Sequence, residues 1–323
     1  MKKTAIILVT DGGFLVPTLV VCKQLAARSA VTDIADIIVY LVDVDDNTRL
    51  KLKSEFKYAG IYFEPLTSKS FVPGKDVYFH QNHVPVVSLA RLALSESISR
   101  QYENILYLDG DLQIVGDVSP LVRYVVPEGK IAVCRGALWL ENITENEHWR
   151  SYLSGLGGVD ANQYFNAGVL AFRRETWSDL APRALQFFFD NSKQCERHDQ
   201  SALNAVCKGR TVELAPAYNF HSPYAALYVQ HSYRPAIIHF TGPNKPWKYA
   251  GLPWGTQFMH SYTELLGQHP FLNDFLSVPG KISISQQAAL CIKDAADTLR
   301  HPRALIRKRA KFFQYVRTHK FPF

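Results

Sequence analysis

Short apolar runs alternate with amphipathic helical patterns through the first 135 residues of this 323-residue chain. We expect strands at 4–10, 36–42, 60–64, 104–108 and 130–134, and helices at 15–28, 46–58 and 84–98. A strand, a helix and a further strand in succession are typical of a parallel sheet with helices on both faces. Ligand sites of such sheets gather at the carboxyl ends of the strands. The alternation therefore predicts an α/β fold and the edge at which its site lies.

The second half has a less regular pattern. We expect strands at 163–173 and 236–240, helices at 178–194, 198–207 and 256–267, and a long helical region at the C-terminus. No repeat or linker divides the body, and 47% hydrophobic residues suffice for a large core. We therefore expect one α/β domain over 1–280 with a helical, basic and aromatic extension over 281–323.

Two aspartates follow the expected strand at 104–108, with one glycine between them. Asp109 and Asp111 can turn both carboxylates toward one divalent cation, and Gly110 lets the chain bend. Oxygen ligands favour Mg²⁺ or Mn²⁺ over zinc, and these ions often keep open positions for the phosphates of a substrate. The alternative is an ordinary turn after a strand.

The cysteines and the N-terminus bear on location. Five scattered cysteines include no C-x-x-C pair and suggest no disulfide framework, which fits a reducing, cytoplasmic compartment. Lys2 and Lys3 precede an apolar run as in a secretory signal, but the run stops at Thr10-Asp11 without a small-residue cleavage site. No segment approaches the roughly 18 consecutive apolar residues of a membrane span. We therefore expect the chain to fold in water.

The positive charge is concentrated at the C-terminus. Residues 300–323 contain eight Lys or Arg and no acid, so the rest of the chain holds 28 basic against 29 acidic residues. Leu305, Phe312 and Val316 lie near one line of a helix, although Arg309 interrupts it. A basic helix with an aromatic, apolar side suits an anionic membrane surface. Nucleic acid is a weaker interpretation because the body has no basic surplus, and a solvated tail is the remaining alternative.

Several polar residues interrupt apolar patterns. Arg91 shares a helix face with Val87, Leu94 and Ile98, where an inward guanidinium needs an anion. That anion is either a structural carboxylate or belongs to the nucleotide or the metal-binding acids. Asn166-Ala167-Gly168 breaks an expected strand, and Gly168 permits close approach of another group; a bulge or turn explains the break as well.

Two further segments carry candidate residues. Asp199-Gln200 opens an expected helix, where Asp199 alone could serve as an N-cap. His239 ends an expected strand and Lys245 follows in a Gly/Pro-rich turn. A histidine in a strand is commonly structural, although imidazole is also an ordinary metal ligand.

Five segments follow one another along the chain: Leu-Ala-Arg-Leu at 89–92, Leu-Tyr-Leu-Asp-Gly-Asp at 106–111, Phe-Asn-Ala-Gly-Val-Leu at 165–170, His-Asp-Gln-Ser-Ala-Leu-Asn at 198–204 and His-Phe-Thr-Gly-Pro-Asn-Lys-Pro-Trp at 239–247. In this order they resemble the family 8 glycosyltransferases, the retaining group that includes bacterial lipopolysaccharide galactosyl- and glucosyltransferases. The resemblance covers about residues 4 to 250. It implies a single Rossmann-like domain of the GT-A type, a UDP-sugar donor, a saccharide or glycolipid acceptor, and a C-terminus on the inner face of the plasma membrane.

The resemblance also implies roles for particular residues. Asp109, Asp111 and His239 would hold Mn²⁺ or Mg²⁺, and Gln200 with Asp199 would stand beside the reacting sugar. The donor site would consist of Thr10, Asp11, Arg91, Asp109, Gly110, Asp111, Asn166, Ala167, Gly242 and Lys245. Two positions depart from the family pattern. Gly13 replaces a polar residue that often contacts uridine, and Cys-Arg-Gly stands at 134–136, where some members have an acid that touches the sugar.

The implied chemistry follows from charge. Departure of UDP leaves positive charge on the sugar and negative charge on the diphosphate, so a dication at the diphosphate stabilises the transition state. Gln200 is a neutral amide and a poor nucleophile, which favours same-face attack over a covalent intermediate. Two other classes compete: a Mg²⁺-dependent D-x-D phosphatase, which usually carries Thr or Val where Gln113 stands, and a non-catalytic, membrane-attached sugar-nucleotide binder. The sequence leaves the sugar, the acceptor and the oligomeric state open.

Overall fold

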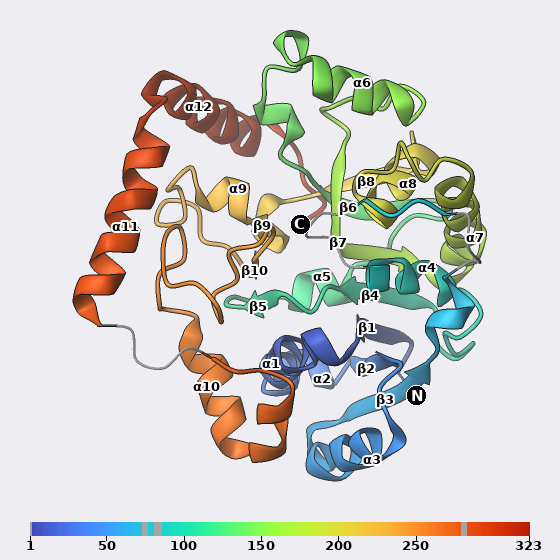
Figure 1. Cartoon of the computed structure of the whole chain (residues 1–323). Helices are drawn as coiled ribbons and strands as arrows, with labels where there is room; N and C mark the ends of the chain where they lie inside the picture. The colour runs from blue at the N-terminus through green and yellow to red at the C-terminus, as the bar shows by residue number, and fades with distance from the viewer. Residues whose placement is uncertain (1, 73–76, 81–85, 279–282) are drawn as a thin grey trace.

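A seven-stranded sheet forms the centre of the computed structural model, which describes residues 2–72, 77–80, 86–278 and 283–323 (Figure 1). The strand order is β3-β2-β1-β4-β7-β6-β8. The strands are β1 (Thr4–Thr10), β2 (Ala35–Val42), β3 (Ile61–Leu66), β4 (Asn104–Leu108), β6 (Ile131–Arg135), β7 (Phe165–Arg173) and β8 (Thr211–Leu214). All five strands expected in the first half are present, within one or two residues of their predicted bounds.

The sheet is mostly parallel, as predicted, with one reversed strand. Strands β3, β2, β1 and β4 run parallel, and β6 runs parallel to β8. Strand β7 lies antiparallel between β4 and β6. The start of β7 therefore lies at the same edge as the ends of β1 and β4, and the backbone N–H of Asp109 donates to the carbonyl of Gly168 at 2.9 Å.

Helices cover both faces of the sheet because successive strand residues point to opposite sides. Ile6 and Leu8 of β1 belong to one apolar cluster, and Ala5, Ile7 and Val9 to the other. The main helices are α1 (Leu15–Ala26), α3 (Asp46–Glu55), α6 (Glu147–Gly155), α7 (Arg174–Asp190), α8 (His198–Val206) and α10 (Met259–Gln268). Shorter helices are α2 (Ser29–Thr32), α4 (Ala90–Ala93), α5 (Ser119–Arg123) and α9 (Ser222–Ala225).

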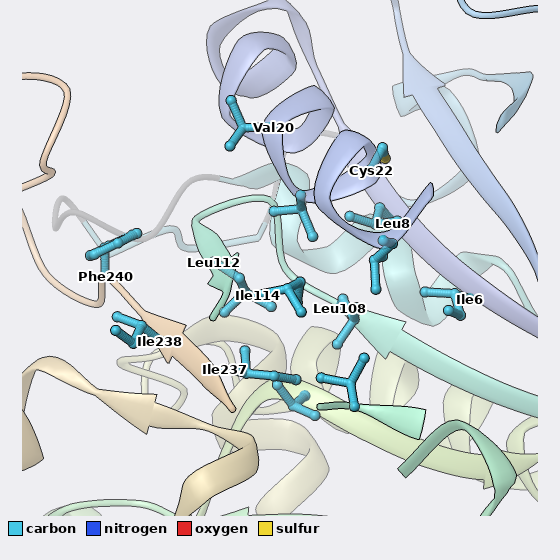
Figure 2. Packing of buried hydrophobic residues seen from close by; sticks show 14 of the residues in the cluster. Ile6, Leu8, Val20, Cys22, Leu108, Leu112, Ile114, Ile237, Ile238 and Phe240 are labelled. Atoms are coloured by element: carbon cyan, nitrogen blue, oxygen red, sulfur yellow. The ribbon is translucent and has the colours of Figure 1, made fainter. Parts of the chain in front are cut away.

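A small second sheet consists of β5 (Leu112–Ile114), β10 (Ile237–His239) and β9 (Phe220–His221). The chain enters β5 directly after Asp111, and β10 pairs antiparallel with it so that His239 lies opposite Leu112. Figure 2 shows Leu112 and Ile114 packed with Ile237 and Ile238 and with residues of β1 and α1. This packing fixes a strand from late in the sequence beside the Asp109–Asp111 turn.

Some predicted elements differ from the structure. The helix predicted at 84–98 begins outside the described residues; the described part is a 3₁₀ turn (Val86–Leu89) and the short α4, followed by turns. The prediction that Arg91, Leu94 and Ile98 face inward is confirmed, since all three are buried. The sequence pattern did not predict β5, β8 or β9, which have only two to four residues each.

The C-terminal extension forms α11 (Ile284–Leu299) and α12 (Pro302–Thr318), which run along one side of the molecule (Figure 1). Phe312 and Tyr315 of α12 are buried in the core cluster that includes β1, and Leu305 and Val316 pack against it. The predicted apolar line of this helix therefore faces the protein, contrary to the expectation that it faces a membrane. Among the described residues, no helix combines the length and apolar character needed to span a bilayer.

Candidate active site

A cleft of about 900 Å³, its open mouth included, lies at the carboxyl ends of β1 and β4. Most of the residues predicted from the sequence line it: Thr10, Arg91, Asp109, Gly110, Asp111, Asn166, Ala167, Asp199, Gln200, His239, Gly242 and Lys245. Asp11 is the exception, because its carboxylate caps a 3₁₀ turn by accepting from the backbone N–H of Phe14 at 3.1 Å.

Three metal-ligand side chains converge in this cleft. One ligand atom each from Asp109, Asp111 and His239 lies within 4.8 Å of the others. His239 Nε2 is 3.1 Å from Asp111 Oδ1 and 3.8 Å from Asp109 Oδ2. Two carboxylates and an imidazole form a donor set that suits Mn²⁺, and the carboxylates alone suit Mg²⁺.

Two glycines make this convergence possible by leaving space. A Cβ on Gly168 would lie 2.2 Å from His239 Cε1 and 2.8 Å from Asp109 Oδ2. A Cβ on Gly110 would lie 2.2 Å from the hydroxyl of Thr18 on α1. Gly110 is therefore required because α1 packs against the turn, a reason that the sequence did not reveal.

Arg91 links two of the three aspartates that line the cleft. Its guanidinium is 2.7 Å from Asp109 Oδ1 and 3.0 Å from Asp199 Oδ2, and it lies over the ring of Tyr107 at 4.4 Å. Burial alone would lower the pKa of Arg91, but Asp109 and then Asp199 raise it above its ordinary value. Two carboxylates therefore serve as the anions that an inward Arg91 needs: Asp109, a candidate metal ligand, and Asp199.

Asp199 does not cap its helix. Helix α8 begins at His198, so Asp199 lies within the first turn, and its side chain is 3% exposed. Burial raises the pKa of Asp199, and the charge of Arg91 opposes that shift. The residue is thus held beside the cleft as the partner of a cation.

Lys245 also lines the cleft, after the left-handed turn at Gly242, whose φ is +84°. Its Nζ is 2.6 Å from Asp111 Oδ2. Burial would raise the pKa of Asp111, but the charge of Lys245 and the contact with His239 lower it well below its usual value. Asp111 therefore stays ionised beside the ammonium group of Lys245.

Gln200 faces the cleft with its amide held on both sides. Its Oε1 accepts from Asn166 Nδ2 at 3.1 Å and from the backbone N–H of Ala167 at 3.2 Å. Its Nε2 donates to the hydroxyl of Tyr164 at 2.9 Å. The break in the apolar pattern at Asn166 reflects these contacts and a register shift in β6 between Val133 and Cys134.

Other residues of the site had not been singled out from the sequence. Tyr107 donates to Asp109 Oδ1 at 3.0 Å from within a strand that appeared wholly apolar, and Asn219 contacts His239 at 2.9 Å. Arg135, at one of the departures from the family pattern, is paired with Glu213 at 2.6 Å and does not line the cleft. A polar atom inside an aromatic or apolar run was the available signal in both missed cases.

The fold and the cleft together define a GT-A type α/β protein in which two aspartates and a histidine converge in a cleft at the carboxyl ends of the strands. The family model described as glycosyl transferase family 8 matches residues 5–251. The chain belongs to that family.

Known relatives and structures agree with this assignment. General stress protein A of Bacillus subtilis is 27% identical over 197 residues, which cover 55% of this chain and 64% of the relative. The lipopolysaccharide 1,2-glucosyltransferase of Escherichia coli is 26% identical over 225 residues, covering 58% and 64%. The matched region thus spans under two thirds of the length of these curated relatives.

The crystal structure of the galactosyltransferase LgtC, solved with donor and acceptor sugar analogs, has a similar fold. It superposes with a TM-score of 0.66 at 19% identity over 85% of this chain and 97% of that chain. At this identity the likeness establishes the fold alone.

Proposed function

We propose that this chain transfers a hexosyl group from a UDP-sugar, with UDP-glucose or UDP-galactose as the first candidates, to a saccharide acceptor. The observation that supports this most strongly is the convergence of Asp109, Asp111 and His239 in the cleft of a family 8 chain. Relatives named as lipopolysaccharide glucosyl- and galactosyltransferases favour a lipopolysaccharide core or another surface glycan as acceptor.

The reaction breaks the bond between the anomeric carbon and a diphosphate oxygen. When bound, Mn²⁺ or Mg²⁺ supplies positive charge to the diphosphate as its negative charge grows. Lys245 and Arg91 line the same cleft and can add to this stabilisation. The acceptor hydroxyl forms the new bond to the anomeric carbon, and its proton passes to the departing diphosphate.

Retention of configuration is proposed to follow from same-face attack. Gln200 Oε1 already accepts two N–H groups, which draw electron density from it and make it a still poorer nucleophile. Asp199 is paired with Arg91, which lowers its reactivity in the same way. Gln200 would stabilise the positive sugar through its carbonyl dipole, and isolation of a glycosylated Gln200 or Asp199 from a reaction without acceptor would refute this mechanism.

The proposed reaction is tested by measuring UDP release from a panel of UDP-sugars with Mn²⁺. We expect one UDP-hexose to give release that chelator abolishes and that Asp111→Asn lowers strongly. Binding of the UDP-sugar without release, with every acceptor tried, would instead identify a non-catalytic sugar-nucleotide binder. Release of inorganic phosphate from phosphate monoesters would favour the D-x-D phosphatase.

We also propose that the chain is divided by function. Residues 1–280 form the glycosyltransferase domain, and residues 281–323 attach the enzyme to the anionic inner face of the plasma membrane. Because the apolar line of α12 packs inward, the lipid-facing candidates are the exposed isoleucines of both helices: Ile284 (88% exposed), Ile292 (70%) and Ile306 (67%). Arg303 and Arg307 share the exposed side of α12 with Ile306. Each such cation contributes at most about 1 kcal/mol near an anionic surface.

Membrane attachment is tested by sedimentation with vesicles. We expect the full chain to bind vesicles containing phosphatidylglycerol more tightly than pure phosphatidylcholine vesicles. Arg303→Glu with Arg307→Glu, and separately Ile292→Ser with Ile306→Ser, should weaken binding. Leu50→Ser, at an exposed leucine (59%) on α3, is the matched control and should not. Equal binding by all variants would overturn the proposal.

A further inference from the structure

A chain of hydrogen-bonded side chains connects the candidate metal ligand His239 to Gln200. His239 Nδ1 is 2.9 Å from Asn219 Oδ1, and Asn219 Nδ2 donates to Asn166 Oδ1 at 2.8 Å. Asn166 Nδ2 then donates to Gln200 Oε1 at 3.1 Å. Asn219 is fully buried and lines no part of the cleft, so solvent water does not compete for the hydrogen bonds at either end of its amide.

Two backbone groups set the direction of this chain. The N–H of Gly168 donates to Asn166 Oδ1 at 3.0 Å, and the N–H of Ala167 donates to Gln200 Oε1 at 3.2 Å. A backbone N–H can only donate, so both side-chain oxygens must stay where they are. Asn219 must therefore offer its NH₂ group to Asn166, because two carbonyl oxygens at this distance would repel each other.

The orientation of Asn219 in turn decides the tautomer of His239. With its NH₂ group directed at Asn166, Asn219 presents its oxygen to His239, so Nδ1 carries a proton. The neutral tautomer with that proton has its lone pair on Nε2, the atom that faces Asp109 and Asp111. The tautomer of a metal-ligating histidine is set by the hydrogen bond of its other nitrogen.

We infer that Asn219 is a positioning residue that holds His239 in the tautomer required for metal binding and, through Asn166, orients the amide of Gln200. The inference rests on the proposed function. A purely structural amide would need only some polar partner at each end, whereas both partners of Asn219 lead to groups that line the cleft. One buried side chain thus couples the metal ligand to the residue beside the sugar.

Substitutions can separate the effects of the two hydrogen bonds that Asn219 makes to His239 and to Asn166. Asn219→Ala removes both hydrogen bonds, so we expect Mn²⁺ affinity, measured by calorimetry with Mn²⁺ alone, to fall about 10- to 100-fold, as for other outer-shell partners. Asn219→Asp keeps an acceptor for His239 but loses the donor to Asn166. We expect it to bind Mn²⁺ at least as tightly as the natural chain, while UDP release at saturating Mn²⁺ falls at least about 10-fold.

Asn204→Ala is the matched control. Asn204 is also buried, but its amide bonds to the backbone of Phe165 and of Gln200 and has no contact with His239. We expect this variant to lose stability in thermal melts while its Mn²⁺ affinity stays within about twofold. If Asn219→Ala fails to fold, the split between affinity and turnover in Asn219→Asp decides the question.

The outcomes separate this inference from the proposed function. Unchanged Mn²⁺ affinity in a folded Asn219→Ala would overturn the inference, as would equal loss of affinity in Asn219→Asp and Asn219→Ala. If Asp111→Asn also left Mn²⁺ affinity unchanged, the metal site itself, and with it the proposed function, would fail. Loss of affinity in Asp111→Asn alone would leave the proposed function intact.

Discussion

Substitution of Gly168 by alanine tests the geometry of the site with a single methyl group. The added Cβ would lie 2.2 Å from Cε1 and 2.7 Å from Nδ1 of His239, and 2.8 Å from Asp109 Oδ2. Ordinary contacts between such atoms are about 3.5 Å, so His239 must retreat by about 1.3 Å or β7 must shift. Overpacking of this kind typically costs about 1–3 kcal/mol of folding free energy.

The functional loss should exceed the loss of stability. A displacement of about 1 Å at a catalytic position can lower the rate about 100-fold, and the displaced atom here belongs to a candidate metal ligand. We therefore expect Gly168→Ala to remain folded at 25 °C, to bind Mn²⁺ at least about 10-fold more weakly, and to release UDP about 100-fold more slowly. Calorimetry with Mn²⁺, UDP release and urea unfolding measure the three quantities.

Gly267 on α10 provides the control for the methyl group itself. A Cβ there meets no atom within 4 Å, and its backbone is helical. Gly267→Ala should stabilise the protein by about 0.5–1 kcal/mol, because alanine favours the helix, and should leave Mn²⁺ affinity unaltered. Natural affinity and turnover in a folded Gly168→Ala would refute the reasoning, since the positions of His239 and Asp109 would then be unimportant.

Three other substitutions test separate parts of the account. Asp111→Asn should lower Mn²⁺-dependent UDP release at least about 100-fold while the circular dichroism spectrum stays unchanged; activity equal to the natural chain would contradict a metal role. Burial lowers the pKa of His221 to about 3, so this histidine stays neutral in the fold while the unfolded chain takes up its proton below about pH 6.5. The free energy of unfolding should therefore decrease as the pH is lowered. His221 should account for about 2 kcal/mol of this decrease between pH 7 and pH 5, and His221→Gln should lose correspondingly less stability in urea titrations. Phe312→Ala should cost about 3–5 kcal/mol of unfolding free energy, whereas exposed Ile306→Ala should change it by under about 0.5 kcal/mol; similar costs would show that α12 is not docked as described.

The sequence predicted the parts of the fold that local patterns determine. Apolar runs such as 104–108 specify strands because each must bury its side chains, and their alternation with helices leaves few arrangements other than a parallel sheet. The aspartates at 109 and 111 then had to lie at the carboxyl edge. The reversed direction of β7 was not predictable in this way, because a mostly apolar strand pattern is equally compatible with either orientation.

Residues of the site that depend on pairing between distant short strands were missed. Asn219 lies beside His239 only because the two-residue β9 pairs with β10, and no local pattern specifies that register. The aromatic residues Phe220, Tyr224 and Tyr233 likewise come together with Phe312 of α12 only through this distant pairing.

The C-terminal helix illustrates a limit of amphipathic patterns. The line of Leu305, Phe312 and Val316 indicates one apolar side but not which apolar surface it covers. A protein core and a membrane surface both favour the same helical spacing of apolar residues, since both remove the same side chains from water. Only the positions of β9, α9 and the 3₁₀ turn Leu138–Leu140 beside α12 decide in favour of the core.

Pulsed EPR of Mn²⁺ bound to the protein with UDP measures the central claim most directly, because it detects both the phosphorus and the histidine nitrogen that contact the ion. We predict coupling to ³¹P of UDP together with coupling to one histidine nitrogen, and loss of the nitrogen signal alone in His239→Ala. Phosphorus coupling without any histidine nitrogen in the natural chain, or Mn²⁺ binding that survives Asp109→Asn with Asp111→Asn, would contradict it.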